Sequence, residues 1–229
     1  TGGVGDKITL ILMPIIASLG LPVAKMSGRG LGFTGGTVDK LESIPGYKTN
    51  ISIDEFKQNV KKIGISLIGQ TMNLAPADKK LYALRDTISC TDSIPLIASS
   101  IMSKKIASGA NKIVIDVTCG SGAFMKTRED AEKLSIIMTK IGKLAGRETV
   151  CIITNMDEPV GYSVGNTLEV IEAVDILKGA YMPKDVEEII TKLGSHILFL
   201  GDKVKSLEEG RKLILENIRN QKAYNKLLE

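Results

Sequence analysis

Residues 112–122 read Lys-Ile-Val-Ile-Asp-Val-Thr-Cys-Gly-Ser-Gly, and this stretch decides the predicted fold. Its β-branched run, centred on residues 113–115, predicts a buried strand of a parallel sheet. Glycines follow the strand directly, and a helical pattern over about 128–144 comes next. A second strand is expected over 149–154. This strand–helix alternation predicts an α/β protein with a mostly parallel sheet flanked by helices.

The N-terminal part of the chain shows the same alternation. An uncharged run from Ile8 to Ala24 could be mistaken for a membrane span. Pro14, Gly20 and Pro22 interrupt it, and it is short for a span. We therefore expect a buried helix that ends near Ser18 and then a short buried strand.

The remaining expected elements complete a three-part division of the chain. A capping box at Ser52 and Glu55 predicts a helix start, and a strand is expected over 65–68. The other helices are expected over 38–43, 77–88 and 94–107, and over most of the chain from 166 onward. We divide the chain into the first part of an α/β phosphate-binding domain (1–76), a small all-α lobe (77–110) and the second part of the α/β domain with C-terminal helices (111–229).

Composition excludes several classes of protein. The 229 residues carry a net charge of only +4, with 4% aromatic residues and no Trp, so nothing indicates a nucleic-acid partner. Cys90, Cys119 and Cys151 are odd in number and widely spaced, which argues against a disulfide framework and favours a cytoplasmic location. We expect no membrane association.

Glycine-rich junctions precede three of the expected helices, at 2–6, 27–37 and 120–122. Backbone N–H groups in such a loop can face an anion, although one loop of this kind is more often only a tight turn. In the 27–37 segment Ser27, Thr34 and Thr37 add hydroxyl donors, which favours anion binding. The P-loop pattern is absent, and Phe33 breaks the dinucleotide pattern, so a free phosphate or a small phosphorylated group is expected.

The two helices of the lobe place polar residues on shared faces. Tyr82 and Arg85 are three residues apart, and Ser100 and Lys104 are four apart. Cations beside hydroxyls suit an anionic or carbonyl-bearing ligand, but a solvated cationic face is an equal alternative. Spacing alone cannot choose these residues over the neighbouring Ser99 and Lys105.

Other reactive residues give weaker signals. Asp116, Glu169 and Glu172 form no evident acid–base pair, and capping and surface solvation are expected to explain most such carboxylates. His196 lies in an apolar helical run and is expected to be packed or partly exposed. Cys119 has no histidine near it to act as a base, so a nucleophilic role is not expected.

The longer motifs together resemble the pyrimidine-nucleoside phosphorylase and thymidine phosphorylase family. The resemblance begins with Thr1-Gly2-Gly3-Val4-Gly5-Asp6 and covers nearly the whole chain. Its further segments are residues 26–32, 34–37, 39–46, 76–86, 93–105 and 120–125. It implies the nucleoside phosphorylase and phosphoribosyltransferase type of fold.

The resemblance also implies an activity, the reversible phosphorolysis of uridine, thymidine or deoxyuridine to free base and a pentose 1-phosphate. Arg85 and Lys104 would then contact the pyrimidine carbonyls, with Tyr82 and Ser100 fixing the ring. The phosphate-binding positions implied by the family are Thr9, Lys25, Met26, Ser27 and Thr37. Phosphate is the co-substrate, no organic cofactor is implied, and a homodimer formed through the helical lobe is expected.

Family members related to the bacterial enzymes also hold a structural potassium ion. The matching positions here are Gly5, Lys7, Val160, Ser163 and Glu172. Backbone carbonyls and one carboxylate suit such a hard cation. A lysine at position 7 fits only if its backbone carbonyl is the ligand.

The chain departs from the family pattern at several points. Phe33 stands where many members have His, and Thr118-Cys119 replaces a commoner Lys-Thr. The Lys-His-Ser that precedes the first motif in the family is not in the sequence, so we expect the central portion of a two-domain enzyme. Two other hypotheses stay open: an anthranilate-type phosphoribosyltransferase, and a non-catalytic remnant that binds phosphate or nucleoside.

Overall fold

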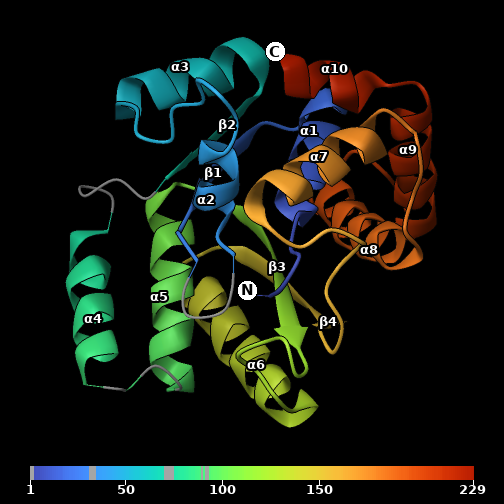
Figure 1. Cartoon of the computed structure of the whole chain (residues 1–229). Coiled ribbons are helices and arrows are strands. Elements are labelled where there is room, and N and C mark those ends of the chain that lie inside the picture. Colours follow the sequence, from blue (N-terminus) through green and yellow to red (C-terminus); the bar gives the residue numbers. More distant parts are fainter. Residues whose placement is uncertain (1–2, 31–34, 70–74, 89, 91–92) are drawn as a thin grey trace. The chain divides into compact units, whose positions relative to one another are not determined.

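The computed structural model shown in Figure 1 describes residues 3–30, 35–69, 75–88, 90 and 93–229. The chain divides into two compact units. Unit 1 is Gln70–Asp157, and unit 2 combines Gly2–Gly69 with Glu158–Glu229. Unit 2 is therefore discontinuous in sequence, with the whole of unit 1 inserted between its two segments.

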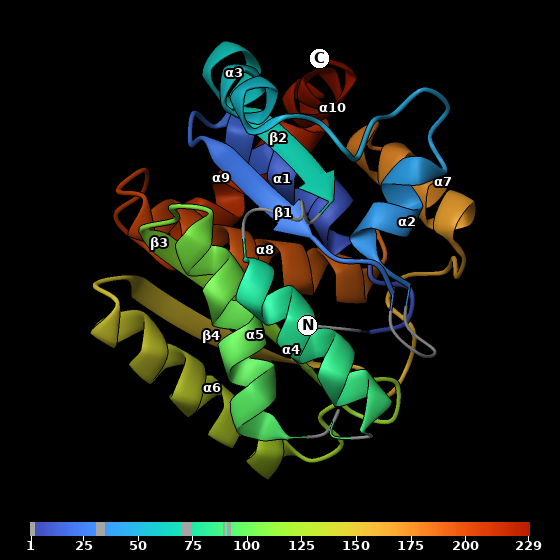
Figure 2. The ribbon, with the colours of Figure 1, turned by 90° about the vertical axis from the view of Figure 1, so that its left-hand side faces the viewer.

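Unit 2 contains a parallel pair of strands, β1 (Val23–Ser27) and β2 (Ile65–Gly69). Val23 pairs with Ile65 and Ser27 with Gly69, so the carboxyl ends of both strands lie at one edge. Figure 2 shows the two arrows running in the same direction. The helix α3 (Ile53–Ile63) packs on both strands, and Ser52 Oγ accepts from Glu55 N at 3.1 Å, as the capping residues predicted.

The helix α1 (Ile8–Ser18) is the buried centre of unit 2. It is apolar all round, and nine of its eleven residues are buried, which is typical of a helix enclosed by other elements. It contacts β1, β2 and four C-terminal helices. Those helices are α7 (Asn166–Leu177), α8 (Lys184–Leu200), α9 (Leu207–Arg219) and α10 (Lys222–Leu228).

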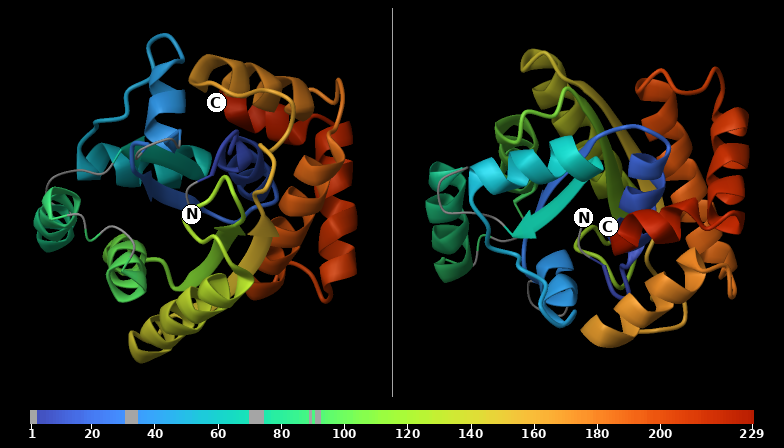
Figure 3. Two further views of the ribbon diagram at one scale, coloured as in Figure 1. Left: turned by 60° about the horizontal axis from the view of Figure 1, so that its bottom comes forward. Right: turned by 90° about the horizontal axis from the view of Figure 1, so that it is seen from above.

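Figure 3 shows α8 and α9 side by side, in agreement with their close packing. The predicted order of a buried helix and then a buried strand is confirmed by α1 and β1.

Within the described ranges, no helix combines the length and the apolar character that crossing a bilayer needs. The remaining helix of unit 2, α2 (Thr37–Glu42), packs on α7.

Unit 1 is built on a second parallel pair, β3 (Lys112–Cys119) and β4 (Glu148–Asn155). Residues 112–119 of the opening stretch therefore form a strand, as predicted, and the glycine-containing residues 120–122 follow it as a turn. Two helices pack together beside it, α5 (Ile94–Ala107) and α6 (Arg128–Leu144), and α6 also lies on β4. The helix α4 (Pro76–Thr87) contacts α5. The core joins α5, β3 and α6 through nine buried residues: Ala98, Met102, Ile113, Ile115, Val117, Met125, Ala131, Leu134 and Met138.

The expected α/β class, with parallel strands and flanking helices, is thus confirmed. The strands that the structure describes pair as two two-stranded parallel sheets, one in each unit. Most element bounds agree with the sequence within a few residues, because apolar periodicity and capping residues mark them. The three-part division at residues 76 and 110 stays a prediction.

We predict that Leu134→Ala lowers the free energy of unfolding by about 2–5 kcal/mol, because it leaves a cavity in the core of unit 1. Leu134 is 1% exposed on α6, whereas Ile136 on the same helix is 56% exposed. Ile136→Ala is therefore the matched control, with an expected change within about 0.5 kcal/mol. Urea unfolding followed by circular dichroism measures both, and equal losses would contradict the assigned core.

Candidate functional site

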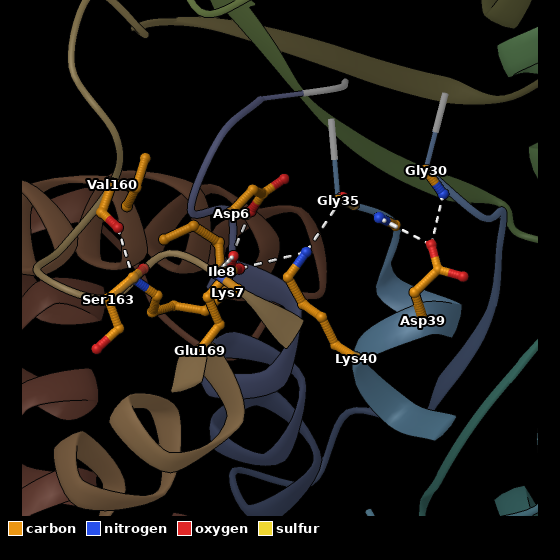
Figure 4. Close-up of polar contacts among 12 residues, drawn as sticks. Asp6, Lys7, Ile8, Gly30, Gly35, Asp39, Lys40, Val160, Ser163 and Glu169 are labelled. Carbon is orange, nitrogen blue, oxygen red and sulfur yellow. Dashed lines mark hydrogen bonds and ion pairs between the residues drawn. The ribbon is translucent and has the colours of Figure 1, made fainter. Parts of the chain in front are cut away.

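The glycine-rich loop after β1 is closed on itself by an acidic side chain. Asp39 Oδ2 accepts from Gly30 N at 2.7 Å and from Gly36 N at 3.2 Å (Figure 4). A Cβ atom on Gly36 would lie 2.1 Å from Gly30 N, so only glycine permits this approach. Asp39 therefore ties the two described ends of the loop to α2. Thr34 and Phe33 lie outside the described residues.

The five predicted phosphate-binding residues all belong to unit 2. Lys25 Nζ on β1 donates to Thr9 Oγ1 on α1 at 2.6 Å. Met26 is buried, Ser27 ends β1, and Thr37 begins α2. Ser27 and Thr37 therefore flank the closed loop at the carboxyl end of a parallel strand, which is where α/β proteins place ligands.

A buried ion pair anchors this loop to the C-terminal segment of unit 2. Lys40 Nζ lies 3.3 Å from Glu169 Oε2 and donates to Gly35 O at 3.1 Å (Figure 4). Both side chains are at most 3% exposed. Glu169 also accepts from Gly165 N at 3.1 Å. Surface solvation does not explain Glu169, because its charge is buried and paired, whereas its bond to Gly165 N at the start of α7 is one of the capping contacts that the sequence analysis allowed.

The five residues predicted as potassium ligands lie close together in the structure. The cation among them is the ammonium group of Lys7. Lys7 Nζ lies 2.5 Å from Val160 O, 3.0 Å from Ser163 O and 2.5 Å from Glu172 Oε2. Figure 4 shows Lys7 pointing at Val160 and Ser163. We call this group the Lys7 cage, formed by Lys7, Val160, Ser163 and Glu172, with Gly5 packed against Val160.

The condition for a potassium site at Lys7 is not met. Its backbone carbonyl accepts from Leu10 N at 3.0 Å and Ile11 N at 3.4 Å and so belongs to the first turn of α1. Glu172 is not a solvated surface residue either, since both it and the Lys7 side chain are 0% exposed. Sequence spacing missed the Lys7–Glu172 pair because the partners lie in the two separate segments of unit 2.

The environment of Glu172 lowers its pKa from the usual 4.5. Burial acts in the opposite direction and is the largest single influence. The hydrogen bond from Lys7 and those from Tyr162 N at 2.9 Å and Ser163 N at 2.8 Å together outweigh burial. Glu172 is therefore held as a carboxylate in the folded protein.

In unit 1 the predicted base-contacting residues form one cluster on α4 and α5. Lys104 Nζ donates to Ser100 Oγ at 3.1 Å and lies 5.4 Å from the centroid of the Tyr82 ring. Arg85 lies 5.5 Å from the same centroid. Asp78, which the sequence analysis did not single out, pairs with Lys104 at 3.2 Å and is 8% exposed.

Arg85 is held in place by backbone carbonyl groups. Its Nε donates to Cys90 O and its Nη1 to Leu96 O, both at 3.3 Å, and the residue is 8% exposed. The neighbouring Ser99 is exposed and bonds Leu96 O of its own helix. Ser100, unlike Ser99, is bonded to Lys104, and the choice of Ser100 and Lys104 as ligand contacts stays a prediction.

The remaining candidates lie elsewhere. His196 bonds Lys192 O on α8 and is partly exposed, as expected. Burial, followed by the charge of Asp157, raises the pKa of the Cys119 thiol, which disfavours a nucleophilic thiolate. Asp116 accepts from Thr154 Oγ1 at 2.6 Å between β3 and β4. Across the described residues, no three His, Cys, Asp or Glu side chains gather as a metal site.

Comparison with known proteins identifies the family of the chain. The sequence profile described as "Glycosyl transferase family, a/b domain" matches residues 1–224. The match covers nearly all of the 229 residues, and the chain belongs to this family.

Curated relatives make the assignment more specific. The pyrimidine-nucleoside phosphorylase of Geobacillus stearothermophilus is 56% identical over 223 residues, which are 97% of this chain and 51% of that protein. The protein of the same name from Bacillus subtilis (strain 168) is 54% identical over 226 residues, 99% of this chain and 52% of that protein. The predicted resemblance is confirmed, and the chain spans about half the length of the curated relatives it matches.

A solved structure supports the fold assignment. The anthranilate phosphoribosyltransferase from Thermus thermophilus matches with a TM-score of 0.70 and 15% sequence identity. The match covers 98% of this chain and 72% of that one. The likeness confirms the phosphoribosyltransferase type of fold that the resemblance implied.

The Lys7–Glu172 pair predicts how stability depends on pH. Because folding lowers the pKa of Glu172, its contribution is complete above the usual 4.5 and is lost as the pH falls through the lower folded value. Glu172→Gln should cost about 3–5 kcal/mol at pH 7, since it leaves the Lys7 charge buried without its partner. The variant should also lose less stability than the parent as the pH falls from neutral to below the usual 4.5.

Urea unfolding at a series of pH values measures this difference. The control is Glu208→Gln, whose carboxylate is 68% exposed and lies 3.8 Å from Lys212, so we expect no change at pH 7. Parallel stability curves for the parent and Glu172→Gln would show that Glu172 carries no pH dependence.

Proposed function

We propose that this chain takes part in the reversible phosphorolysis of pyrimidine nucleosides. Uridine, thymidine or deoxyuridine would react with phosphate to give the free base and ribose or deoxyribose 1-phosphate. The observation that carries the proposal is the Tyr82–Arg85–Ser100–Lys104 cluster. It occurs in a chain more than 50% identical to proteins named pyrimidine-nucleoside phosphorylase.

The cluster in unit 1 suits the pyrimidine base. A pyrimidine offers carbonyl oxygens in its ring plane, and Arg85 and Lys104 are cations with fixed positions beside a hydroxyl. Asp78 holds Lys104 from α4, and Tyr82 lies against both cations. In this proposal Arg85 and Lys104 contact the base, and Ser100 and Tyr82 fix its ring.

The loop region of unit 2 suits phosphate. Ser27 and Thr37 carry hydroxyl donors on either side of the closed loop, and Lys25 adds a positive charge bonded to Thr9. Met26 contributes through its backbone. Thr9, Lys25, Met26, Ser27 and Thr37 are therefore the proposed phosphate-binding residues.

The proposed reaction requires no nucleophile from the protein. A phosphate oxygen forms a bond to the anomeric carbon of the sugar as the bond from that carbon to the base nitrogen breaks. The bonding electron pair leaves with the base, so negative charge develops on its carbonyl oxygens. Preorganised cations stabilise that charge, which is the role we give to Arg85 and Lys104. Protonation of the base then completes the reaction.

Two other functions are distinguished by assay. The likeness to anthranilate phosphoribosyltransferase concerns the fold, and that class would show diphosphate-dependent transfer in place of phosphate-dependent release of uracil from uridine. A non-catalytic remnant of such an enzyme would bind phosphate and uracil in calorimetric titrations but would show no turnover. The spatial cluster at Arg85 and Lys104 favours the phosphorylase.

We predict that a variant on the base side lowers the reaction rate, whereas a variant on the phosphate side lowers the affinity for phosphate. Lys104→Ala should lower the rate of uracil release about 100-fold or more and leave phosphate affinity nearly unchanged, because it removes charge stabilisation at the base. Ser27→Ala should weaken phosphate binding roughly 10-fold, because it removes one hydroxyl donor to an anion. Uracil release and calorimetric titration with phosphate measure the two effects.

The control is Lys105→Ala, which removes the adjacent cation on the same helix, with an expected rate change far smaller than that of Lys104→Ala. Equal losses of rate and phosphate affinity in Lys104→Ala would contradict its role at the base. An unchanged phosphate affinity in Ser27→Ala would remove Ser27 from the site.

We further propose a homodimer formed through the helical lobe, in the cytoplasm. Leu81, Leu84 and Ile88 recur along α4 and its C-terminal end and are 54–56% exposed, so they present an apolar surface suited to a second copy. The three cysteines are free thiols, which suits a reducing compartment.

We predict that sedimentation velocity gives twice the 24.6 kDa chain mass for the parent and the single mass for Leu84→Glu, which puts a charge into the apolar surface. The control is Ile136→Glu on α6, where the residue is equally exposed and outside the lobe, and it should stay dimeric. A monomeric parent would overturn the dimer.

A further inference from the structure

We infer that the ammonium group of Lys7 is a built-in substitute for a monovalent metal ion, so that the stability of this chain does not depend on potassium. The resemblance implies a potassium ion held by Gly5, Lys7, Val160, Ser163 and Glu172. The residues at these positions do not fit that ion, because the cation already present is covalently part of the chain.

The Lys7 cage satisfies an ammonium group completely. A lysine ammonium has three N–H donors and no acceptor. Val160 O, Ser163 O and Glu172 Oε2 supply three acceptors at 2.5, 3.0 and 2.5 Å. No donor of Lys7 is left over, and the single negative charge of Glu172 balances its single positive charge.

The acceptors are also the kind that hold a bare monovalent cation. Backbone carbonyl oxygens replace the hydration shell of potassium in proteins that bind it. A simple salt bridge to Glu172 would need no carbonyl groups, yet two converge on Lys7 Nζ from the 160–163 turn. The arrangement is therefore an oxygen cage around a cation.

The walls of the cage leave no space for a second cation. Lys7 and Glu172 are both 0% exposed in their side chains. A Cβ atom on Gly161 would lie 2.7 Å from Lys7 Nζ and 2.9 Å from Glu172 Oε1, so the backbone itself closes this side. A Cβ on Gly5 would lie 2.8 Å from Val160 O. A metal ion could enter only by expelling the ammonium group, whose charge would repel it.

The ammonium group of Lys7 joins the two sequence segments of unit 2. Lys7 precedes α1 in the first segment, and its three acceptors belong to the second, which begins at Glu158. A metal ion at this point would connect the same segments, but its contribution would depend on its concentration. A tethered ammonium group contributes at any salt composition.

The test compares thermal unfolding in potassium chloride, sodium chloride and choline chloride at one ionic strength. Lys7→Thr shortens the side chain and leaves the oxygen cage open to an ion. Lys7→Met fills similar volume without charge. The exposed control Lys192→Thr removes a lysine that is 58% exposed in its side chain. Each variant is made in the full chain, and unfolding does not depend on turnover.

We expect the parent and Lys192→Thr each to unfold at a temperature that is the same in all three salts. Lys7→Thr and Lys7→Met should both lose roughly 5–20 °C in choline chloride, because each leaves Glu172 buried and unpaired. Potassium chloride should restore at least half of that loss in Lys7→Thr and none in Lys7→Met.

Two results would overturn the inference. One is a potassium-specific rise in the melting temperature of the parent. The other is a loss in Lys7→Thr that is equal in all three salts, which would make the pair an ordinary salt bridge. If Lys7→Thr does not fold in any salt, equilibrium dialysis of the parent against radioactive rubidium ion decides: no saturable binding supports the inference, and one saturable site per chain overturns it.

Discussion

The ion pair between Lys7 and Glu172 is the constraint on which the architecture of unit 2 depends. Burying two charges is costly unless every donor and acceptor is satisfied, and here the ammonium group meets three oxygens while the carboxylate also accepts two backbone N–H groups. The pair fixes the start of α1 against the 160–163 turn and α7. Because α1 contacts β1 and β2, the pair is connected through α1 to the strand that carries the glycine-rich loop.

Acidic side chains also fix the positions of cations and backbone N–H groups at the two candidate binding sites. Asp39 closes the glycine-rich loop through two backbone N–H groups, and Glu169 anchors the loop through Lys40. In unit 1, Asp78 holds Lys104 in position beside Tyr82. None of these carboxylates is proposed to contact a substrate. Their common role is to fix cations and backbone donors in advance, so that a ligand need not order them on binding.

The sequence predicts local structure better than it predicts these partnerships. Apolar periodicity, β-branched runs and the Ser52 cap depend on neighbours in the chain, which is why α3, α6 and β3 lie where they were expected. Tyr82 and Arg85 were recognisable through spacing and family resemblance. The sequence does not predict the partners of Glu169 and Asp78, because those partners lie across loops or on other helices, and only the family resemblance groups Glu172 with Lys7. A carboxylate on a helix looks the same in sequence whether it faces solvent or a buried lysine.

Because unit 1 is inserted within unit 2, the two segments of unit 2 are synthesised at different times. The helix α1 is apolar on every side, yet the 160–163 turn and the four helices that enclose α1 come much later in the chain, as the Lys7–Val160 separation of 153 shows. At a synthesis rate of about 5–20 residues per second, roughly 8–30 s pass between the synthesis of Lys7 and that of Val160, the first of these later partners. During translation the sides of α1 that α7, α8, α9 and α10 cover in the folded protein therefore stay uncovered by these helices while unit 1 is being made.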